Sequence, residues 1–477
     1  MRTDLFIGNA WGPAASGRRF DVINPATEEV LASVAEGDAA DIDRAVAAAR
    51  GCFESAEWRG LSARKRGALL FKAADLLASR LAEMAELETR QNGKPLFESK
   101  IDVSSTVETL RYYAGWCDKF GGETVPVDGN FLTYIRHEPV GVVGAIVPWN
   151  FPLNIAGWKF APALAAGCTI VLKPASETPL TALLMGEIFQ EAGLPAGAFN
   201  VVPGHGSTAG AALVRHPGVD KISFTGSTAV GQRIMRDAAD TVKRLTLELG
   251  GKSPNIVFDD ADLAAAVRGA QNGIFYGKGE VCAAGSRLLV HRKVKDQVVE
   301  QLAERTRTLV PGDPFDKKTR LGAIVSRQQQ ESVLQYIATG SAEGATLVAG
   351  GKAATVNGKG YFVEATVFDA VKPDMTIARE EIFGPVLAVL GFDDEEEAVA
   401  LANQSMYGLA AGIWSRDVGR AHRVAHAIRA GTVWVNTYNM YDPGAPFGGY
   451  KASGFGRDLG RVALDGYTET KSVWIAL

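Results

Sequence analysis

Residues 141–174 read GVVGAIVPWNFPLNIAGWKFAPALAAGCTIVLKP, and this stretch decides the fold class. Two short apolar runs, 142–147 and 169–172, flank an apolar stretch at 153–166 that is long enough for a helix. A strand, a helix and a second strand in this order form the unit of a parallel sheet. The rhythm continues with strands expected at 199–202 and 221–224 and helices at 180–191 and 207–214. We therefore predict an α/β fold whose parallel sheet is the usual platform for a dinucleotide.

The rest of the chain divides into a helical part, a strand-rich arm and a second alternating region. Residues 40–120 are mostly helical in pattern, most clearly at 65–88, and the sequence NGKP at 92–95 is a stop signal. Residues 122–140 carry apolar side chains among turn residues and are expected to form strands. Further strands are expected at 288–290, 386–390, 432–435 and 471–477. A chain of 477 residues with this organisation suggests roughly three domains.

The composition is that of an ordinary soluble globular protein and argues against several classes of partner. Hydrophobic residues make up 47% and charged residues 22% of the chain. The formal charge of −4 without a dense Lys/Arg block argues against nucleic acid. No apolar run reaches the ~18 residues that span a membrane, and segment 1–6 lacks a signal-peptide core. Scattered cysteines without disulfide or metal spacing indicate a reducing cytoplasm and no metal: Cys52, Cys117, Cys168 and Cys282.

Cys282 lies in GEVCAAGSR, residues 279–287, where small residues leave a thiol within reach of a substrate carbonyl. Glu248 lies 34 residues earlier (282 − 248) in the apolar, glycine-ended run LELGGK, residues 247–252. A thiol that forms a thioester and a carboxylate that activates water are the two groups needed to oxidise an aldehyde to an acid. Taken alone, the two residues also fit a buried structural thiol and an ordinary salt-bridged acid.

A hydride acceptor is the third requirement, and the sequence contains no complete phosphate-binding fingerprint for it. The stretch GHGSTAG, residues 204–210, imitates that fingerprint weakly, and a plain strand-to-helix turn explains it as well. The run FTGSTAVG, residues 224–231, follows a strand and opens a helix, so Ser227 is expected either at a pyrophosphate or as a simple helix cap. Lys173 ends another strand, either at the ligand-binding edge of the sheet or as a solvated surface lysine.

Together these segments resemble the aldehyde dehydrogenase superfamily over nearly the whole chain. The motifs that carry the resemblance are PWNFP (148–152), KPAS (173–176), FTGS (224–227), LELGGK (247–252), the loop of Cys282, EEIFGP (380–385) and PFGGYK (446–451). The resemblance implies a Rossmann-like coenzyme domain (1–121 and 141–249), an α/β catalytic domain (250–445) and a small β oligomerisation flap (122–140 and 463–477). It also implies a homo-oligomer, expected to be a tetramer built as a dimer of dimers.

The resemblance assigns each catalytic group a role in the NAD(P)-dependent oxidation of an aldehyde to an acid. Cys282 attacks the aldehyde as a thiolate, and the Asn150 amide together with the Cys282 backbone N–H holds the oxyanion. Hydride transfer to the nicotinamide leaves a thioester, and Glu248 activates the water that hydrolyses it. Relatives that pass the acyl group to coenzyme A generally lack this glutamate, so the hydrolytic branch is expected.

The same resemblance places the coenzyme along the ends of the first parallel sheet. Lys173 is expected near the adenine ribose, Ser227 at the pyrophosphate, Glu381 at the nicotinamide ribose and Phe383 against the nicotinamide. Ser176 stands where NAD-preferring relatives often carry a glutamate that repels a 2′-phosphate, so both NAD and NADP are expected to bind. The complete set of expected coenzyme residues is Ile146, Pro148, Trp149, Lys173, Ser176, Gly206, Phe224, Gly226, Ser227, Leu249, Glu381 and Phe383.

The family's aldehyde tunnel corresponds in this chain to an apolar and aromatic set without Arg or Lys: Phe151, Ile155, Trp158, Val281, Tyr441 and Phe447. Such a lining suits medium-chain aliphatic or aromatic aldehydes rather than phosphorylated or carboxylated ones. Facing aromatic rings such as Trp158 and Tyr441 would alternatively hold a trimethylammonium group, as in betaine aldehyde, and the set also fits a plain hydrophobic core. Alternatives of other classes are a cofactor-independent thiol esterase that uses Cys282 and a binding protein that has lost catalysis.

Two residues depart from the family pattern. Glu280 stands where relatives usually have glutamine, and a charge so close to Cys282 would raise the pKa of the thiol if it faced the sulfur. We expect the Glu280 side chain to point away. Asp458 replaces a common glutamate, and we expect this change to be neutral at a structural turn.

Overall fold

One largely parallel sheet organises the first half of the chain in the computed structural model, which describes residues 2–477. Its strand order is β2-β1-β9-β8-β7-β10-β11-β23; strands β9 to β11 run parallel, and β1, β2 and β23 add antiparallel edges. The bounds are β1 Leu5–Ile7, β2 Ala10–Gly12, β7 Val142–Ile146, β8 Thr169–Lys173, β9 Phe199–Val201, β10 Lys221–Thr225, β11 Arg244–Glu248 and β23 Gly454–Phe455. The strands expected from 142 to 224 therefore form.

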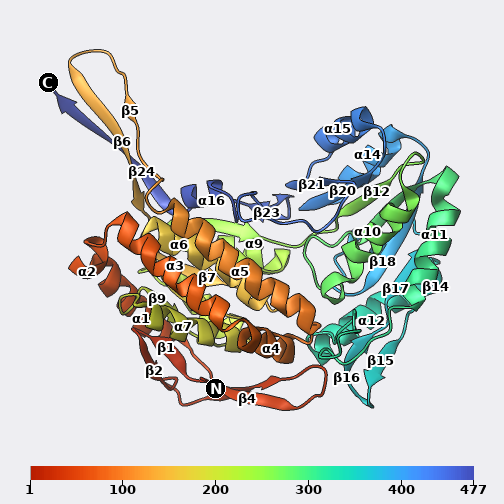
Figure 1. The fold of residues 1–477 in the computed structure, drawn as a ribbon, viewed down its shortest axis with the longest axis horizontal. Coiled ribbons are helices and arrows are strands. Elements are labelled where there is room, and N and C mark those ends of the chain that lie inside the picture. The colour runs from red at the N-terminus through yellow and green to blue at the C-terminus, as the bar shows by residue number, and fades with distance from the viewer. Residues whose placement is uncertain (1) are drawn as a thin grey trace.

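Helices cover both faces of this sheet because alternate side chains of its buried strands point to opposite sides. Val142 and Val171 belong to an apolar cluster with α1, α8 and α9, whereas Val143 and Ile170 belong to the cluster of α3 to α7. Figure 1 shows α3 and α5 lying across one face. The helices are α1 Ala39–Glu54, α2 Ala56–Arg59, α3 Ala63–Ser79, α4 Leu81–Asn92, α5 Leu96–Trp116, α6 Pro152–Ala166, α7 Leu180–Ala192, α8 Ala211–Arg215 and α9 Thr228–Ala238.

A second sheet organises the later part of the chain in the order β14-β17-β18-β13-β12-β20-β21, parallel except for the edge strand β14. Val257 and Leu288 pack with α10 and α11 on one face, and Ile256 and Leu289 pack with α12 to α15 on the other. The strands are β12 Pro254–Val257, β13 Arg287–His291, β14 Thr346–Ala349, β17 Thr366–Asp369, β18 Val386–Phe392, β20 Ala410–Trp414 and β21 Thr432–Val435. The helices are α10 Leu263–Phe275, α11 Arg292–Arg307, α12 Arg327–Ala342, α13 Thr376–Arg379, α14 Glu395–Asn403 and α15 Val418–Ala427.

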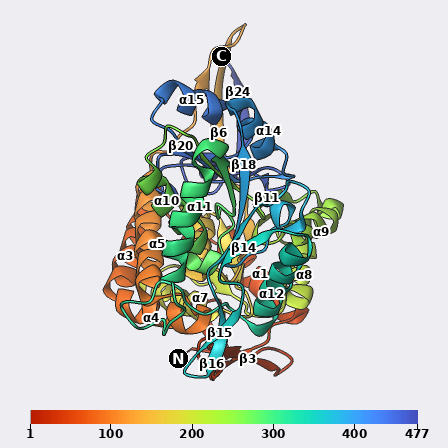
Figure 2. The same ribbon diagram turned by 90° about the vertical axis from the view of Figure 1, so that its right-hand side faces the viewer.

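Strands β5, β6 and β24 form a separate sheet that projects from the body and carries the C-terminus at its far end (Figure 1 and Figure 2). β24 (Thr468–Ala476) pairs antiparallel with β6 (Phe131–Pro139) along its whole length, and β5 (Thr124–Val125) pairs with the other edge of β6. Large apolar side chains of this sheet are exposed: Phe131, Leu132, Trp474 and Ile475. Such an arm leaves strand edges and apolar surface that a partner can cover.

Two hairpins complete these layers, β3 Arg19–Ile23 with β4 Val30–Ala35 and β15 Ala353–Val356 with β16 Lys359–Val363. The short strands β19 Tyr407–Gly408 and β22 Tyr450–Lys451 pair over a long sequence distance, and α16 spans Val462–Asp465. Within residues 2–477, no helix combines the length and the apolar character needed to cross a membrane.

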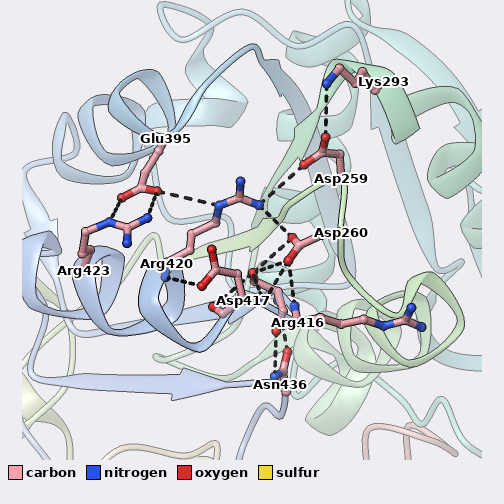
Figure 3. A network of polar contacts seen from close by, with 10 residues as sticks. Asp259, Asp260, Lys293, Glu395, Arg416, Asp417, Arg420, Arg423 and Asn436 are labelled. Atoms are coloured by element: carbon pink, nitrogen blue, oxygen red, sulfur yellow. Dashed lines mark hydrogen bonds and ion pairs between the residues drawn. The ribbon is translucent and has the colours of Figure 1, made fainter.

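A polar network holds the ends of β12 and β20 together (Figure 3). Asp260 follows β12, and its carboxylate accepts hydrogen bonds from Ser415 Oγ (2.8 Å), from the backbone N–H groups of Arg416 and Asp417 (3.0 and 2.9 Å) and from the Arg420 guanidinium (2.8 Å). The Arg420 guanidinium also approaches Glu395 at 3.7 Å, which links α15 to α14. The network stabilises the scaffold of the second sheet and lies on its polar surface.

The structure departs from the sequence-based expectations mainly in the first 120 residues. Strands β1 to β4 precede the first helix and were not expected. The helical pattern at 65–88 is interrupted at Arg80, which has a non-helical backbone (φ −105°, ψ 18°) and separates α3 from α4. The Arg80 guanidinium contacts Glu83 at 2.8 Å and Glu187 of α7 at 2.9 Å, so a long-range contact favours the break. The expected helix at 207–214 begins as a wider turn at Gly206–Gly210 and continues as α8.

Candidate active site

The loop that carries Cys282 is held against the EEIFGP segment by a tight backbone turn. Gly277, Lys278 and Gly279 all have left-handed φ angles, of 58°, 62° and 73°. A Cβ at Gly279 would lie 2.1 Å from the carbonyl oxygen of Gly384, so this approach requires glycine. Two motifs about one hundred residues apart in the sequence are therefore in direct contact.

The LELGGK segment lies against the same loop. Glu248 is the last residue of β11 and is 3% exposed. A Cβ at Gly251 would lie only 2.3 Å from the Cys282 carbonyl oxygen, and one at Gly250 would lie 2.2 Å from Glu381 Oε2. The two glycines thus allow the segment after Glu248 to approach both the Cys282 loop and Glu381.

Asn150 reaches the Cys282 loop from the end of β7. Its side-chain Nδ2 donates a hydrogen bond to the Glu280 carbonyl oxygen at 2.8 Å. Its Oδ1 is buried and has no hydrogen-bond partner among residues 2–477. An amide nitrogen carries two hydrogens, so one N–H remains for a ligand beside Cys282.

A cavity of about 530 Å³ leads to Cys282, and its wall contains all six side chains expected for the aldehyde tunnel. Trp158, Tyr441 and Phe447 form a triangle of rings with centroid distances of 5.4 to 6.2 Å. The expected residues in the wall are Phe151, Ile155, Trp158, Val281, Tyr441 and Phe447.

Helix α5 also lines this cavity, which the sequence did not indicate. Lys100, Ser104 and Glu108 are spaced at helical intervals on α5. The cavity wall therefore contains a lysine, although we expected a wall without Arg or Lys. The remaining unexpected wall residues are Ile101, Asp102, Ser105, Asn154, Asn272, Tyr276, Asn439, Met440 and Pro443. The helical spacing of polar residues on α5 is visible in the sequence, but nothing in the sequence connects that helix with Cys282.

Both reactive groups are shifted toward their neutral forms. Burial raises the pKa of the Cys282 thiol to about 12, with smaller contributions from the charges of Glu248 and Glu381. Burial also raises the pKa of Glu248 well above its usual range, and the nearby Asp458 carboxylate adds to this shift, whereas Lys159 and Arg457 oppose it. A carboxylic acid with a raised pKa is suited to exchange protons near neutral pH.

The structure places Asp458 in a buried ion pair rather than at a simple structural turn, and the neutrality of the change from glutamate stays a prediction. Asp458 is buried and accepts a hydrogen bond from Lys159 Nζ of α6 at 2.5 Å, in an ion pair that is almost fully inaccessible. The same carboxylate raises the pKa of Glu248. The residue therefore belongs to the electrostatic environment of the expected base, although the backbone at Asp458 also bridges to Phe447.

Glu280 is directed away from the thiol, as expected. One carboxylate oxygen lies 2.8 Å from Lys278 Nζ, and the other accepts a hydrogen bond from the Val325 backbone N–H at 3.1 Å. The charge of Glu280 is thus balanced by a neighbouring cation within the protein.

Most residues expected at the coenzyme lie at the carboxyl ends of adjacent parallel strands of the first sheet, whereas Glu381 and Phe383 come from the segment before β18. The chain moves from β7 outward to β8 and β9 and then returns to the other side of β7 as β10, so the strand order reverses at β7 and β10. Ligands of open α/β sheets bind in the crevice at such a point. The rings of Trp149 and Phe383 pack edge to face, with their centroids 5.2 Å apart. Ser227 and Glu381 line one cleft of about 800 Å³.

The polar groups of this crevice suit a dinucleotide. Lys173 is buried, donates to the Gly204 carbonyl at 2.9 Å and has its pKa lowered to about 8 by burial, so the alternative of a solvated surface lysine is wrong. Ser227 caps α9 by accepting from the Val230 N–H, at a helix end that favours phosphate. Glu381 accepts from the Gly251 N–H at 2.9 Å through one of its two carboxylate oxygens.

The other expected coenzyme residues surround these groups. Gly226 packs on the Phe224 ring and Gly231 on Leu249, since a Cβ at either glycine would lie 2.5 Å from those side chains. A Cβ at Gly206 would meet nothing within 4 Å, so this turn borders open space. Gln329 was not expected, and its Nε2 holds the Phe383 carbonyl at 2.8 Å. Ile146, Pro148 and Ser176 are at least partly buried at the ends of β7 and β8.

A dinucleotide-type crevice and a cavity that ends on a cysteine meet at one loop, and this arrangement defines the class of thiol-dependent oxidoreductases. Residues 11–473 match the model of the aldehyde dehydrogenase family. The chain is 48% identical to human retinal dehydrogenase 2 over 478 residues, which cover 100% of this chain and 92% of the relative.

Two solved structures agree with this match. The NAD+ complex of an aldehyde dehydrogenase from Bacillus cereus is 52% identical, with a TM-score of 0.99 over 100% of this chain and 97% of that chain. The P. syringae AldA indole-3-acetaldehyde dehydrogenase in complex with NAD+ and IAA is 48% identical, with a TM-score of 0.98 over 99% and 96% of the two chains. The chain belongs to the aldehyde dehydrogenase family and is an NAD-dependent oxidoreductase.

Proposed function

We propose that this enzyme oxidises apolar aliphatic or aromatic aldehydes to carboxylic acids, with water and NAD+ or NADP+, through covalent intermediates on Cys282. The observation that carries the proposal is the cavity that reaches Cys282, whose loop is contacted by Asn150 at the Glu280 carbonyl and by Gly251, next to Glu381, while the charge of Glu248 acts on the thiol. A nucleophile, an oxyanion donor, a base and a ribose ligand are then within one site.

The first step is the addition of the thiol to the aldehyde. Because the pKa of Cys282 is raised to about 12, the sulfur must lose its proton as it attacks, and ionised Glu248 is the nearby base that can accept it. The Cys282 sulfur then bonds to the carbonyl carbon, and the carbonyl oxygen becomes an oxyanion. The free N–H of Asn150 and the Cys282 backbone N–H stabilise that oxyanion.

The second half of the reaction forms and hydrolyses a thioester. When bound beside Cys282, the nicotinamide would supply the acceptor for the hydride of the former aldehyde carbon. Glu248 first releases the Cys282 proton to solvent and, ionised again, takes a proton from water as the water oxygen attacks the thioester carbon. The carbon–sulfur bond breaks, the carboxylic acid leaves, and Cys282 is regenerated.

The lining of the cavity supports apolar substrates. Phe151, Trp158, Tyr441 and Phe447 give it an aromatic wall, and most of its polar residues come from α5. The relatives named for retinal and for indole-3-acetaldehyde act on bulky apolar aldehydes, which is consistent with this lining. The ring triangle also supports a second candidate, an aldehyde with a trimethylammonium group.

Use of both coenzymes is supported by Ser176. Position 176 carries a hydroxyl group and no carboxylate. This hydroxyl donates a hydrogen bond to Glu177 Oε2 at 3.1 Å. A serine neither repels a 2′-phosphate nor takes both ribose hydroxyls. We therefore expect kcat/KM values for NAD+ and NADP+ within about tenfold of each other, and a preference for NAD+ above a thousandfold would contradict this.

We also propose that the chain has the three domains expected from its sequence and assembles into an oligomer. The coenzyme domain comprises 1–121 and 141–249, the catalytic domain 250–445, and the flap 122–140 and 463–477. Exposed Phe131, Leu132 and Trp474 on the flap support assembly of copies of this chain into a tetramer. The buried unpaired cysteines of the described chain support a cytoplasmic location.

A panel of aldehydes with NAD+ and NADP+, run beside Cys282→Ala, tests the proposal. The wild type should produce reduced coenzyme fastest with hexanal or benzaldehyde, and Cys282→Ala should produce none while still binding the coenzyme. Faster turnover of succinic semialdehyde or glyceraldehyde 3-phosphate would contradict the substrate class, and faster turnover of betaine aldehyde would favour the second candidate. Ester cleavage without any coenzyme reduction would instead indicate a thiol esterase.

A further inference from the structure

The turn before Cys282 contains a lysine in an unusual setting. Lys278 is 1% exposed, and its left-handed φ of 62° lies between those of Gly277 and Gly279. Left-handed backbone is unfavourable for a lysine, and a buried ammonium requires partners. Such a residue persists only where the surrounding contacts require it.

The Lys278 ammonium joins two groups that are far apart in the sequence. Nζ donates to the carbonyl oxygen of Asn92 at 3.0 Å and to Asn92 Oδ1 at 2.8 Å. It also lies 2.8 Å from Glu280 Oε2. One cation thus links the end of α4 to the residue two places before Cys282.

Both partners of Lys278 also contact the Asn150 loop. The Glu280 carbonyl oxygen accepts from Asn150 Nδ2 at 2.8 Å. The side-chain Nδ2 of Asn92 donates to the Trp149 carbonyl at 2.7 Å and approaches the Asn150 carbonyl at 3.5 Å. Asn92 therefore holds the backbone at Asn150, and the Glu280 carbonyl holds the Asn150 side-chain amide.

We propose that Lys278 is a positioning residue that aims the amide of Asn150 at the oxyanion, through Asn92 on the backbone side and Glu280 on the side-chain side. The proposal rests on the proposed function, in which Asn150 is an oxyanion donor. The Glu280 carbonyl takes one of the two amide hydrogens and thereby directs the other. Donors that are oriented before the reaction need no reorganisation as charge develops.

The neighbouring charges explain why loss of Lys278 alone should be harmful. Glu280 is buried, so without Lys278 its carboxylate would lack its nearest cation. The adjacent Lys94–Asp102 ion pair, with a distance of 2.6 Å, is already engaged, and Glu98 adds a further acid that accepts from the Gly277 N–H at 3.3 Å. Replacing both Lys278 and Glu280 by glutamine removes the unpaired charge while keeping polar side chains of similar size.

A double-mutant cycle tests the proposal in the full-length enzyme. The variants are Lys278→Met, Asn150→Ala, their combination and Lys278→Gln/Glu280→Gln, each measured for kcat, KM, coenzyme Kd and Tm with hexanal and NAD+. Lys278→Met should lower kcat by about tenfold to a hundredfold with coenzyme Kd unchanged, and the glutamine pair should restore kcat to within about threefold of wild type. In the Asn150→Ala background, Lys278→Met should change kcat by less than about twofold.

Lys221→Met is the matched control, because Lys221 is also buried but donates to Thr246 of β11 at 2.5 Å. Its effect on kcat should be the same in both backgrounds. An equal loss from Lys278→Met in both backgrounds would overturn the positioning role, and so would a glutamine pair no better than Lys278→Met. A wild-type kcat in Asn150→Ala would instead refute the oxyanion role of Asn150. If Lys278→Met does not fold, Lys278→Arg is judged by the same cycle.

Discussion

Replacing Gly251 by alanine should slow the chemistry at Cys282 without weakening coenzyme binding. A Cβ on Gly251 would lie 2.3 Å from the Cys282 carbonyl oxygen, whereas ordinary contact begins at 3.4 Å. The Cys282 backbone must therefore retreat by about 1.1 Å (3.4 − 2.3). The obstacle is a backbone atom, which cannot swing aside as the end of a side chain can.

A displacement of about 1 Å in a reacting group costs roughly a hundredfold in rate, so kcat should fall by about that factor. Gly250→Ala is the matched control, because its Cβ would meet Glu381 Oε2 at 2.2 Å, the mobile end of a side chain. That variant should raise KM for NAD+ through the displaced Glu381 and lower kcat much less. Gly12→Ala, where a Cβ meets nothing within 4 Å, should change neither constant.

The assay follows reduced coenzyme at saturating NAD+ and aldehyde, with coenzyme Kd from fluorescence and Tm from calorimetry. Alkylation of Cys282 by iodoacetamide, followed by mass spectrometry, reports whether the thiol has moved. A Gly251→Ala enzyme with wild-type kcat and Tm would show that the position of the Cys282 loop is not critical, and the reasoning would fail.

Four other perturbations have defined outcomes. Asp458→Asn removes a charge that raises the pKa of Glu248, so the ionised base should persist to lower pH and the acidic limb of the kcat–pH profile should move down; an unmoved limb would contradict this. Ser176→Glu should lower kcat/KM for NADP+ at least about tenfold while NAD+ changes less than about threefold, because like charges meet at the 2′-phosphate. Asp260→Asn weakens the hydrogen bonds of the network in Figure 3 and should lower the free energy of unfolding by about 1–2 kcal/mol, seen as a lower Tm with unchanged kcat. Trp474→Glu places a charge on the exposed flap and should dissociate the oligomer in sedimentation runs, whereas an unchanged mass would place the interface elsewhere.

The strands of the first sheet were predictable because each is a short apolar run between turns and helices. Strands β7 and β8 follow directly from the pattern of 142–172, since burial on both faces requires continuous apolar residues. Strands β1 to β4 were not predictable in the same way. They are short, partly exposed elements whose pairing, as of β1 with β9, is decided by residues far along the chain.

The candidate site was likewise predictable only in part. The cavity wall contains the six expected side chains, but the contribution of α5 was missed, because Lys100 and Ser104 look like an ordinary polar helix face. The ion pair of Asp458 was missed for a related reason. Its partner Lys159 lies 299 residues away, so only the folded chain reveals the ion pair.

By itself, the sequence determined the α/β class and the family and predicted which groups react, because short motifs carry the expected nucleophile, the expected base and the turn glycines in order. Only the tertiary structure decided the direction in which the pKa values of Cys282 and Glu248 shift, the polar part of the cavity wall and the contacts that hold Asn150. The physical reason is that the pKa of a buried group and the shape of a cavity depend on everything that surrounds them in space, whatever its distance along the chain.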